Sequence, residues 1–296
     1  MYAAILLGVV LAGPAPTEDA RTQAIRVMNE GYKQATFDKR GSAGLAKFVE
    51  ATTIDPRYEL AWYNLGVARE QHGMTEEAAE AYRSGVAVAA GEAKVELQFR
   101  LARADFALAE AASDSRTTRR ARLTEARELL AAVVEAEPHR IKARLLLART
   151  LDALDRPVDA DAAYRAVIQA DPRRSDAFVG LGRMYIDYGH ADAGLAVLTL
   201  NTEINTIEVG AWLGLGEALL AVDRPAEAVE ALKKAARIDP DVVEVRFRLG
   251  LAYAELRQRK EAIEQLELFL TRVGPSTPDA LVRAARDTIA RMQDVI

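Results

Sequence analysis

The chain has 296 residues, of which 50% are hydrophobic but only 6% are aromatic, and it contains no cysteine. The absence of cysteine excludes disulfides, zinc–thiolate centres and thiol catalysis. The net charge of −5 arises from 39 basic and 44 acidic residues that are intermixed. No long basic stretch is present, so no nucleic-acid partner is expected. Because Ala, Leu, Glu and Arg outnumber β-branched and aromatic residues, we expect an all-α protein.

Residues 1–16 differ in composition from the rest of the chain. Residues 3–13, AAILLGVVLAG, are apolar and uncharged, and Pro14, Ala15 and Pro16 follow. An apolar run of this length before small residues is typical of a secretory signal peptide, and it is too short to span a bilayer. We therefore predict an exported, periplasmic protein with no transmembrane span in the mature chain. No basic residue precedes the run, so the alternative is an apolar leader or helix cap on a cytoplasmic protein.

The next segments, 22–57, 59–91 and 92–140, each have the pattern of a helix pair. The second segment places large and small residues at helical spacings on both sides of Gly73: Trp62, Leu65, Gly66, Ala78 and Tyr82. The third segment is longer, and we expect a first helix over 93–112, a mobile peripheral loop over 113–120 and a second helix over 123–136. Four arginines in this region either contact an anionic partner or are simply solvated: Arg116, Arg119, Arg120 and Arg122.

From Ile141 the chain divides without gaps into four segments of equal length: 141–174, 175–208, 209–242 and 243–276. Equivalent positions agree in four sets: Leu147, Leu181, Leu215 and Leu249; Ala148, Gly182, Gly216 and Gly250; Ala160, Gly194, Ala228 and Ala262; Tyr164, Leu198, Leu232 and Leu266. Small residues on both helices of a pair allow close crossing, and proline after aspartate ends the second helix. Asn201 and Thr206 interrupt this pattern, so we expect a looser or differently angled junction there. Residues 278–296 are predicted to form an amphipathic capping helix.

This pattern resembles the tetratricopeptide repeat, whose W-x2-L-G-x2-Y, A-x3-F and P positions recur with a period of about 34 residues. Trp212, Leu215, Gly216, Ala228 and Pro240 match that pattern, as do the residues of the second segment. The resemblance implies a right-handed superhelical solenoid over residues 22–276, with about seven helix pairs and the terminal cap.

The resemblance also implies that first helices line a concave groove and that certain repeat positions face it. Carried onto this sequence, those positions give a partner-binding set: Tyr63, Asn64, Leu145, Leu146, Arg149, Val179, Arg183, Ile186, Leu213, Glu217, Phe247, Arg248 and Leu251. We expect Phe247 to be an aromatic anchor, and Gly180 and Gly214 to leave room for an incoming segment. The three arginines of the set, Arg149, Arg183 and Arg248, would steer acidic groups of the partner or pair with them. The carboxylate clamp of chaperone adaptors is not expected, because Met28 and Tyr32 occupy two of its positions.

No catalytic constellation is found. The three histidines, His72, His139 and His190, lie at predicted turns without metal-binding spacing. We therefore expect no metal, no cofactor and no enzymatic activity. The function predicted is a non-catalytic scaffold that binds a peptide or amphipathic helix of a partner protein, within a bacterial envelope assembly. The alternative is a regulatory or substrate-docking subunit of an enzyme or secretion system whose catalysis lies in another chain.

Overall fold

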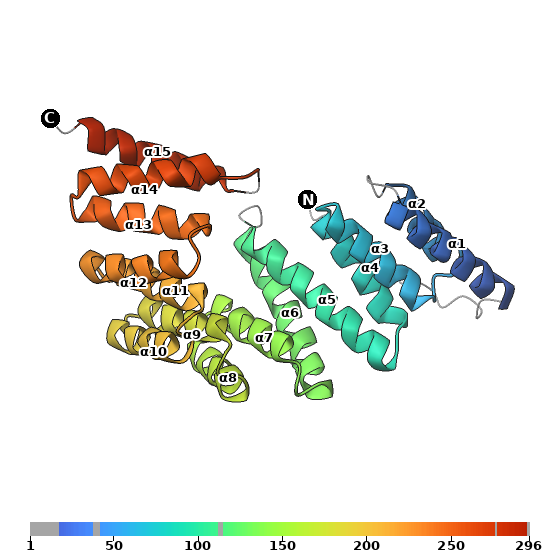
Figure 1. The fold of residues 1–296 in the computed structure, drawn as a ribbon. Helices are drawn as coiled ribbons and strands as arrows, with labels where there is room; N and C mark the ends of the chain where they lie inside the picture. The colour runs from blue at the N-terminus through green and yellow to red at the C-terminus, as the bar shows by residue number, and fades with distance from the viewer. Residues whose placement is uncertain (1–17, 38–41, 112–114, 276, 295–296) are drawn as a thin grey trace, which may run out of the picture. The chain divides into compact units, whose positions relative to one another are not determined.

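The computed structural model describes residues 18–37, 42–111, 115–275 and 277–294, and the predicted leader lies outside these ranges. Within the described ranges the protein is all-α, with fifteen helices and no strand, which confirms the predicted fold class (Figure 1). The helices are α1 (Glu18–Phe37), α2 (Ser42–Ile54), α3 (Glu59–Gln71), α4 (Thr75–Val88), α5 (Gly91–Glu110), α6 (Arg116–Ala136), α7 (Ile141–Ala153), α8 (Pro157–Ala170), α9 (Ser175–Asp187), α10 (Ala191–Ile204), α11 (Val209–Ala221), α12 (Pro225–Ile238), α13 (Val243–Glu255), α14 (Arg259–Arg272) and α15 (Asp279–Asp294).

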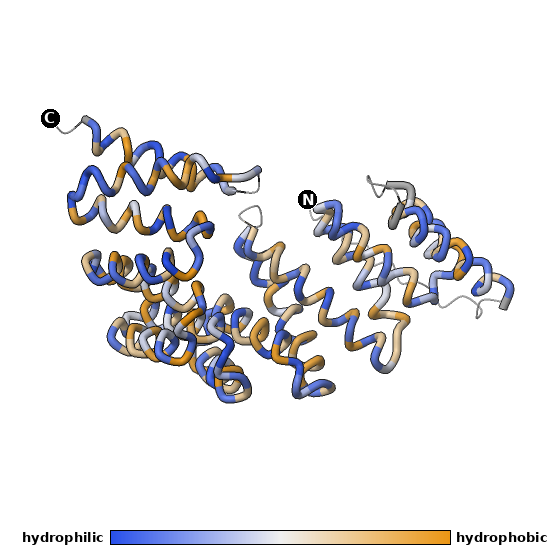
Figure 2. The backbone as a smooth tube through the Cα atoms, in the orientation of Figure 1, coloured by the Kyte–Doolittle hydropathy of each residue, from blue (hydrophilic) through white to orange (hydrophobic). Residues whose placement is uncertain are grey.

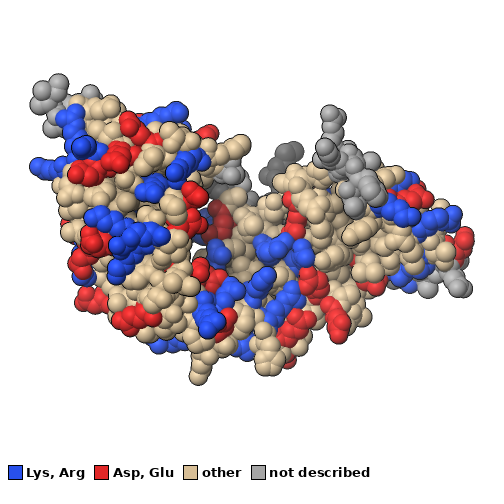
Figure 3. All heavy atoms as spheres, in the orientation of Figure 1, with Lys and Arg blue, Asp and Glu red and all other residues tan. Residues whose placement is uncertain are grey.

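The chain divides into two compact units, Met1–Ala143 (unit 1) and Arg144–Ile296 (unit 2). Within each unit, consecutive helices pack as hairpins, α1 on α2, α3 on α4 and α5 on α6, then α9 on α10, α11 on α12 and α13 on α14. Hydrophobic and hydrophilic residues alternate around the helices (Figure 2). Each helix therefore has an apolar side for its neighbours and a polar side for solvent. Basic and acidic side chains are interspersed over the visible surface (Figure 3).

Four hairpins, α3–α4, α9–α10, α11–α12 and α13–α14, close where a glycine on the first helix meets a large side chain on the second. A Cβ atom placed on Gly216 would lie 2.5 Å from Cγ of Leu232, and one on Gly250 would lie 2.6 Å from Cγ of Leu266. In unit 1 the ring of Tyr82 fills the same place against Gly66. The repeated glycine–large-residue pairs of the sequence are therefore steric partners, since protein interiors leave no room for an added methyl group there.

The turn between first and second helix has the same backbone geometry in five hairpins. Its left-handed residue is Gly73, Asp155, Gly189, Asp223 or Arg257, with φ between 57° and 83°. In each turn the next residue donates its N–H to the carbonyl five residues earlier, as His190 does to Tyr185 at 2.7 Å. This arrangement satisfies carbonyls at the helix end.

We expect Gly189→Ala to lower the free energy of unfolding by about 1–2 kcal/mol, because a Cβ disfavours the left-handed conformation. The matched control is Gly210→Ala in α11, where a Cβ would meet its nearest atom, Ser175 Oγ, only at 3.8 Å. Inside a helix this change should raise the free energy of unfolding by about 0.5–1 kcal/mol. Urea denaturation of both variants measures the difference. Changes of the same sign would contradict the importance of the turn conformation.

Between repeats, an aspartate ends the second helix and folds the chain back. The carboxylates of Asp55, Asp171 and Asp239 accept N–H bonds from the backbone two residues later at 2.9–3.1 Å. This is the local bond by which aspartate favours turns.

The junction at 201–206 is not loose, which corrects the first of the two alternatives expected from its sequence. Asn201 is fully buried and donates to Ser175 Oγ at 3.0 Å. Asn205 donates to Asn201 Oδ1 at 2.8 Å and to the Pro172 carbonyl at 3.3 Å. These buried amides pair with one another and with the preceding repeat, so hydrogen bonds replace the usual apolar contact.

The predicted loop over 113–120 is also wrong where it is described. Helix α6 begins at Arg116, and the Ser115 hydroxyl caps it by accepting the Thr118 N–H at 3.1 Å. Residues 113 and 114 lie outside the described ranges. The extra residues of this segment lengthen the two helices to 20 and 21 residues, compared with 13 or 14 in the neighbouring hairpins.

Helix α15 packs against α13 and α14 at the end of unit 2. Its Ala285 is fully buried in a cluster with Phe247, Leu266 and Phe269. The apolar side of the last hairpin is therefore covered by α15.

Candidate functional site: the first-helix faces

The first helices of consecutive hairpins contact one another, α3 with α5 in unit 1 and α9, α11 and α13 in order in unit 2. We call the partly accessible side chains along these contacts the first-helix face of each unit. In unit 2 the face consists of Val179, Arg183, Ile186, Leu213, Glu217, Leu220, Arg248 and Leu251. In unit 1 it consists of Tyr63, Asn64, Glu70, Glu96, Arg100 and Arg103.

The face of unit 2 carries a continuous apolar component. Val179, Ile186, Leu213 and Leu220 are partly buried and pack their inner sides against the core of α10–α13. Leu251 does the same against the cluster under α15. The remaining surface of these side chains is accessible to solvent and is spread over three neighbouring helices. On α7, Leu146 is half-buried and Arg149 is exposed.

Phe247 and Leu145 do not belong to an accessible face, which corrects two predicted site residues. Phe247 is 2% exposed, and its ring centroid lies 5.1 Å from that of Phe269. Leu145 is 8% exposed. The physical reason for Phe247 is that α13 packs against α15 as well as α14, so its side chain fills a core position.

The two glycines expected to leave space for a partner are also filled from within the chain. A Cβ on Gly180 would lie 2.5 Å from the Tyr164 ring, and one on Gly214 would lie 2.6 Å from Cγ2 of Val179. These glycines therefore allow close helix packing and provide no cavity.

The charged groups of the unit 2 face are partly paired. Arg248 forms ion pairs with Glu217 at 2.7 Å and with Glu244 at 3.5 Å. Burial raises the pKa of Glu217, while Arg248 and Arg183 oppose that rise. Arg248 is thus occupied by carboxylates of its own chain, which corrects its expected role as a steering charge. Arg183 is exposed and faces the same glutamate.

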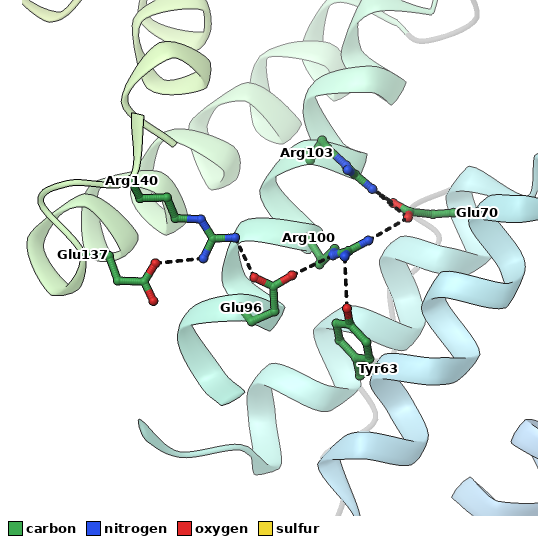
Figure 4. A network of polar contacts seen from close by, with 7 residues as sticks. All are labelled: Tyr63, Glu70, Glu96, Arg100, Arg103, Glu137 and Arg140. Atoms are coloured by element: carbon green, nitrogen blue, oxygen red, sulfur yellow. Dashed lines mark hydrogen bonds and ion pairs between the residues drawn. The ribbon is translucent and has the colours of Figure 1, made fainter. Parts of the chain in front are cut away.

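In unit 1 the face is a polar network (Figure 4). Arg100 donates to Tyr63 Oη at 3.0 Å and to Glu96 at 2.8 Å, and Arg103 binds both oxygens of Glu70 at 2.7 and 2.9 Å. Arg140 extends the network, binding Glu96 at 2.6 Å and Glu137 at 3.0 Å. Burial opposes ionisation of Glu96, but the hydrogen bonds from Arg100 and Arg140 lower its pKa.

Three arginines and three glutamates therefore balance along this network. Asn64 is also engaged, donating to the Leu60 carbonyl at 2.8 Å and to Met28 Sδ at 3.3 Å. Tyr63 and Asn64 are partly accessible on α3, but their polar atoms are bound within the chain. Sequence spacing does not reveal this network, because its members come from α3, α5 and the turn after α6.

A second polar cluster lies where α4, α5 and α6 meet, and sequence analysis missed it. Asp105 is fully buried, and one oxygen lies 3.5 Å from both Arg83 and Arg122. The two arginines form their shorter bonds to Glu125 and Glu76. The other Asp105 oxygen has no hydrogen-bond partner within the described chain. Burial, reinforced by Glu125, raises the pKa of Asp105 to about 7 against the opposing effect of the arginines.

The four arginines at 116, 119, 120 and 122 therefore fall into two groups, those bound within the chain and those that line the surface of α6. Arg122 belongs to the Asp105 cluster, and Arg119 donates to the Ala109 carbonyl at 3.0 Å. Arg116 and Arg120 line an open depression along α6. All three histidines are exposed. Among the described residues no group of three or more acidic or histidine side chains could hold a metal ion, and no helix is long and apolar enough to cross a membrane.

Comparison with known proteins agrees with this architecture. Two tetratricopeptide-repeat family models match the sequence, one over residues 209–252 and one over residues 60–84 and 244–273. A search of curated proteins found no significant match. A tetratricopeptide repeat protein from Parabacteroides merdae is 11% identical, with a TM-score of 0.68 over 92% of this chain and 100% of that one.

Two further solved structures are similar over about two thirds of this chain. YrrB, described as a TPR protein with an unusual peptide-binding site, is 20% identical, with a TM-score of 0.52 over 65% of this chain and 95% of YrrB. TTC0263 from Thermus thermophilus is 19% identical, with a TM-score of 0.52 over 66% of this chain and 99% of its own. The chain is a tetratricopeptide-repeat protein with an all-α solenoid fold. Proteins of this family generally mediate protein–protein interactions.

Proposed function

We propose that this protein is a non-catalytic scaffold and that the first-helix face of unit 2 holds an amphipathic segment of a partner protein. The observation that carries this proposal is the row of partly accessible apolar side chains over three helices, Val179 and Ile186 on α9, Leu213 on α11 and Leu251 on α13. A partner helix or extended peptide can remove the remaining apolar surface of this row from water.

Charge determines which amphipathic segments fit best. Arg183 is exposed at the edge of the row, whereas the charge of Arg248 is already compensated by Glu217 and Glu244. An acidic partner residue would meet Arg183 without displacing an existing ion pair. We therefore expect bound segments to combine an apolar side with at least one carboxylate.

The experiment selects peptides from a displayed random library on the full chain and measures their association by stopped-flow fluorescence. Arg183→Glu should slow association and reduce its salt dependence, because exposed charges act mainly on the encounter rate. Leu213→Ala should speed dissociation, with a loss of affinity of about 1–2 kcal/mol. The matched control is Arg237→Glu on α12, an exposed charge reversal on a second helix of the same unit.

Thermal melting of each variant separates lost binding from lost folding. Selected peptides that bind Arg183→Glu and Leu213→Ala as tightly and as fast as the unchanged protein would contradict the proposed site.

The proposed setting is a bacterial envelope assembly, reached by export through the apolar segment 3–13. Mass spectrometry of the native protein should then show a chain that begins between Ala15 and Glu18. A native cytoplasmic protein that retains Met1 would refute export, and it would leave the binding proposal intact.

A further inference from the structure

The outward side of α10 carries a row of exposed apolar side chains. Leu200 is 47% exposed, Ile204 43% and Ile207 84%. Leu200 and Ile204 are four residues apart and lie on one side of α10, and Ile207 lies in the turn that follows the helix. We call these three residues the α10 patch.

Packing within the repeat does not require this patch. The core side of α10 is formed by other residues, namely Gly194, Leu195, Leu198, Asn201 and Thr202, all of which are buried. The equivalent positions one repeat later in the chain are Lys234, Ile238 and Asp241, and those one repeat earlier are Ala166, Ala170 and Arg173. The repeat pattern therefore tolerates polar and small residues at these three positions. Of the three repeats compared, only the one that contains α10 has large aliphatic side chains at all three positions.

Within α10 and the turn that follows it every charged residue is acidic, whereas the neighbouring turn, whose Pro172 carbonyl accepts from Asn205, carries Arg173. Helix α10 contains Asp192 and Glu203 but no lysine or arginine, and Glu208 follows in the turn. Glu203 and Glu208 are exposed and form no ion pair with the described part of the chain. An occupant that covers the patch must therefore approach two uncompensated carboxylates.

We propose that the α10 patch is a second docking surface, independent of the first-helix face, and that it binds a basic amphipathic helix of another protein. The apolar side of that helix would lie along Leu200, Ile204 and Ile207, and its lysines or arginines would pair with Glu203 and Glu208. A second copy of this chain fits less well, because pairing two α10 patches brings like charges together.

The test uses three synthetic 18-residue probes and the full chain. The first is a leucine–lysine helix with one apolar side, the second is its leucine–glutamate counterpart, and the third is a scrambled leucine–lysine peptide without an apolar side. Fluorescence anisotropy should show binding of the first probe that is at least tenfold tighter than that of the other two. The double variant Ile204→Ser/Ile207→Ser should weaken this binding at least tenfold.

Further variants show where on the chain the first probe binds. Val158→Ser removes an exposed aliphatic side chain of α8, 83% exposed, and should leave binding unchanged. Glu203→Gln/Glu208→Gln should weaken binding at low salt and reduce its salt dependence, since fewer charges are then screened. Arg183→Glu on the first-helix face should not weaken binding, which separates this surface from the one proposed above.

Equal binding of the ordered and scrambled basic probes would overturn the proposal, as would no binding of the first probe. Full binding by the Ile204→Ser/Ile207→Ser variant would also overturn it. Sedimentation velocity decides the remaining alternative: a concentration-dependent dimer that Ile207→Ser dissociates would assign the α10 patch to a second copy of the chain and overturn the proposed partner.

Discussion

Phe247→Ala should lower the free energy of unfolding of unit 2 by about 3–5 kcal/mol, as expected when a buried phenylalanine is replaced by alanine. The ring packs against Phe269 and lies in the cluster that α15 covers. Its removal deletes apolar contacts from three helices at once and leaves a cavity among them. Urea denaturation followed by circular dichroism measures the change.

The control for this variant is Leu251→Ala, which shortens a partly accessible side chain of the same helix. It should cost clearly less stability than Phe247→Ala, because part of the leucine surface is already in contact with water. If Phe247→Ala instead left the melting temperature unchanged and weakened peptide binding, Phe247 would be an anchor on an accessible face.

The second large effect concerns Asp105, whose pKa is raised to about 7, compared with about 3.9 for an aspartate in an unfolded chain. Between these two values the folded protein binds a proton that the unfolded chain does not. Stability conferred by this group therefore falls as the pH rises from about 4 to about 7, and the full cost of the buried charge persists above that range. The cluster holds three carboxylates but only two arginines, so one proton relieves its excess negative charge.

Asp105→Asn removes this titration while nearly preserving the side-chain shape. We expect the variant to exceed the unchanged protein in stability by up to about 4 kcal/mol at pH 8, from the conversion of a pKa difference into free energy. The advantage should disappear near pH 4. Urea denaturation at intervals of one pH unit measures it, with the exposed Asp187→Asn as control. A stability difference that does not vary with pH would show that Asp105 does not take up this proton.

The first-helix faces were only partly predictable. Repeat position selected Val179, Ile186 and Leu213, which are partly accessible on the neighbouring helices α9 and α11, and their role in binding stays a prediction. It failed for Phe247, because that ring packs against Phe269 and lies in one buried cluster with Ala285 of α15, which repeat position alone does not show. It also failed for Gly180 and Gly214, because a missing side chain has the same appearance in the sequence whether a partner or the chain itself fills the space.

Local signals in the chain were sufficient for the all-α class, the helix pairs and most turns, but not for the start of α6 or the junction at 201–206. These features can be recognised without the folded structure because each depends on residues close together in the sequence. They are the helix propensity, the equivalent residues that recur from repeat to repeat, and the Asp-Pro turns. Contacts between distant side chains are decided only by packing. The ion pairs of Arg100 and Arg140, the buried amides at Asn201 and Asn205 and the buried carboxylate of Asp105 join different helices. Which charges are compensated, and which apolar side chains remain exposed, depends on how those helices pack against one another.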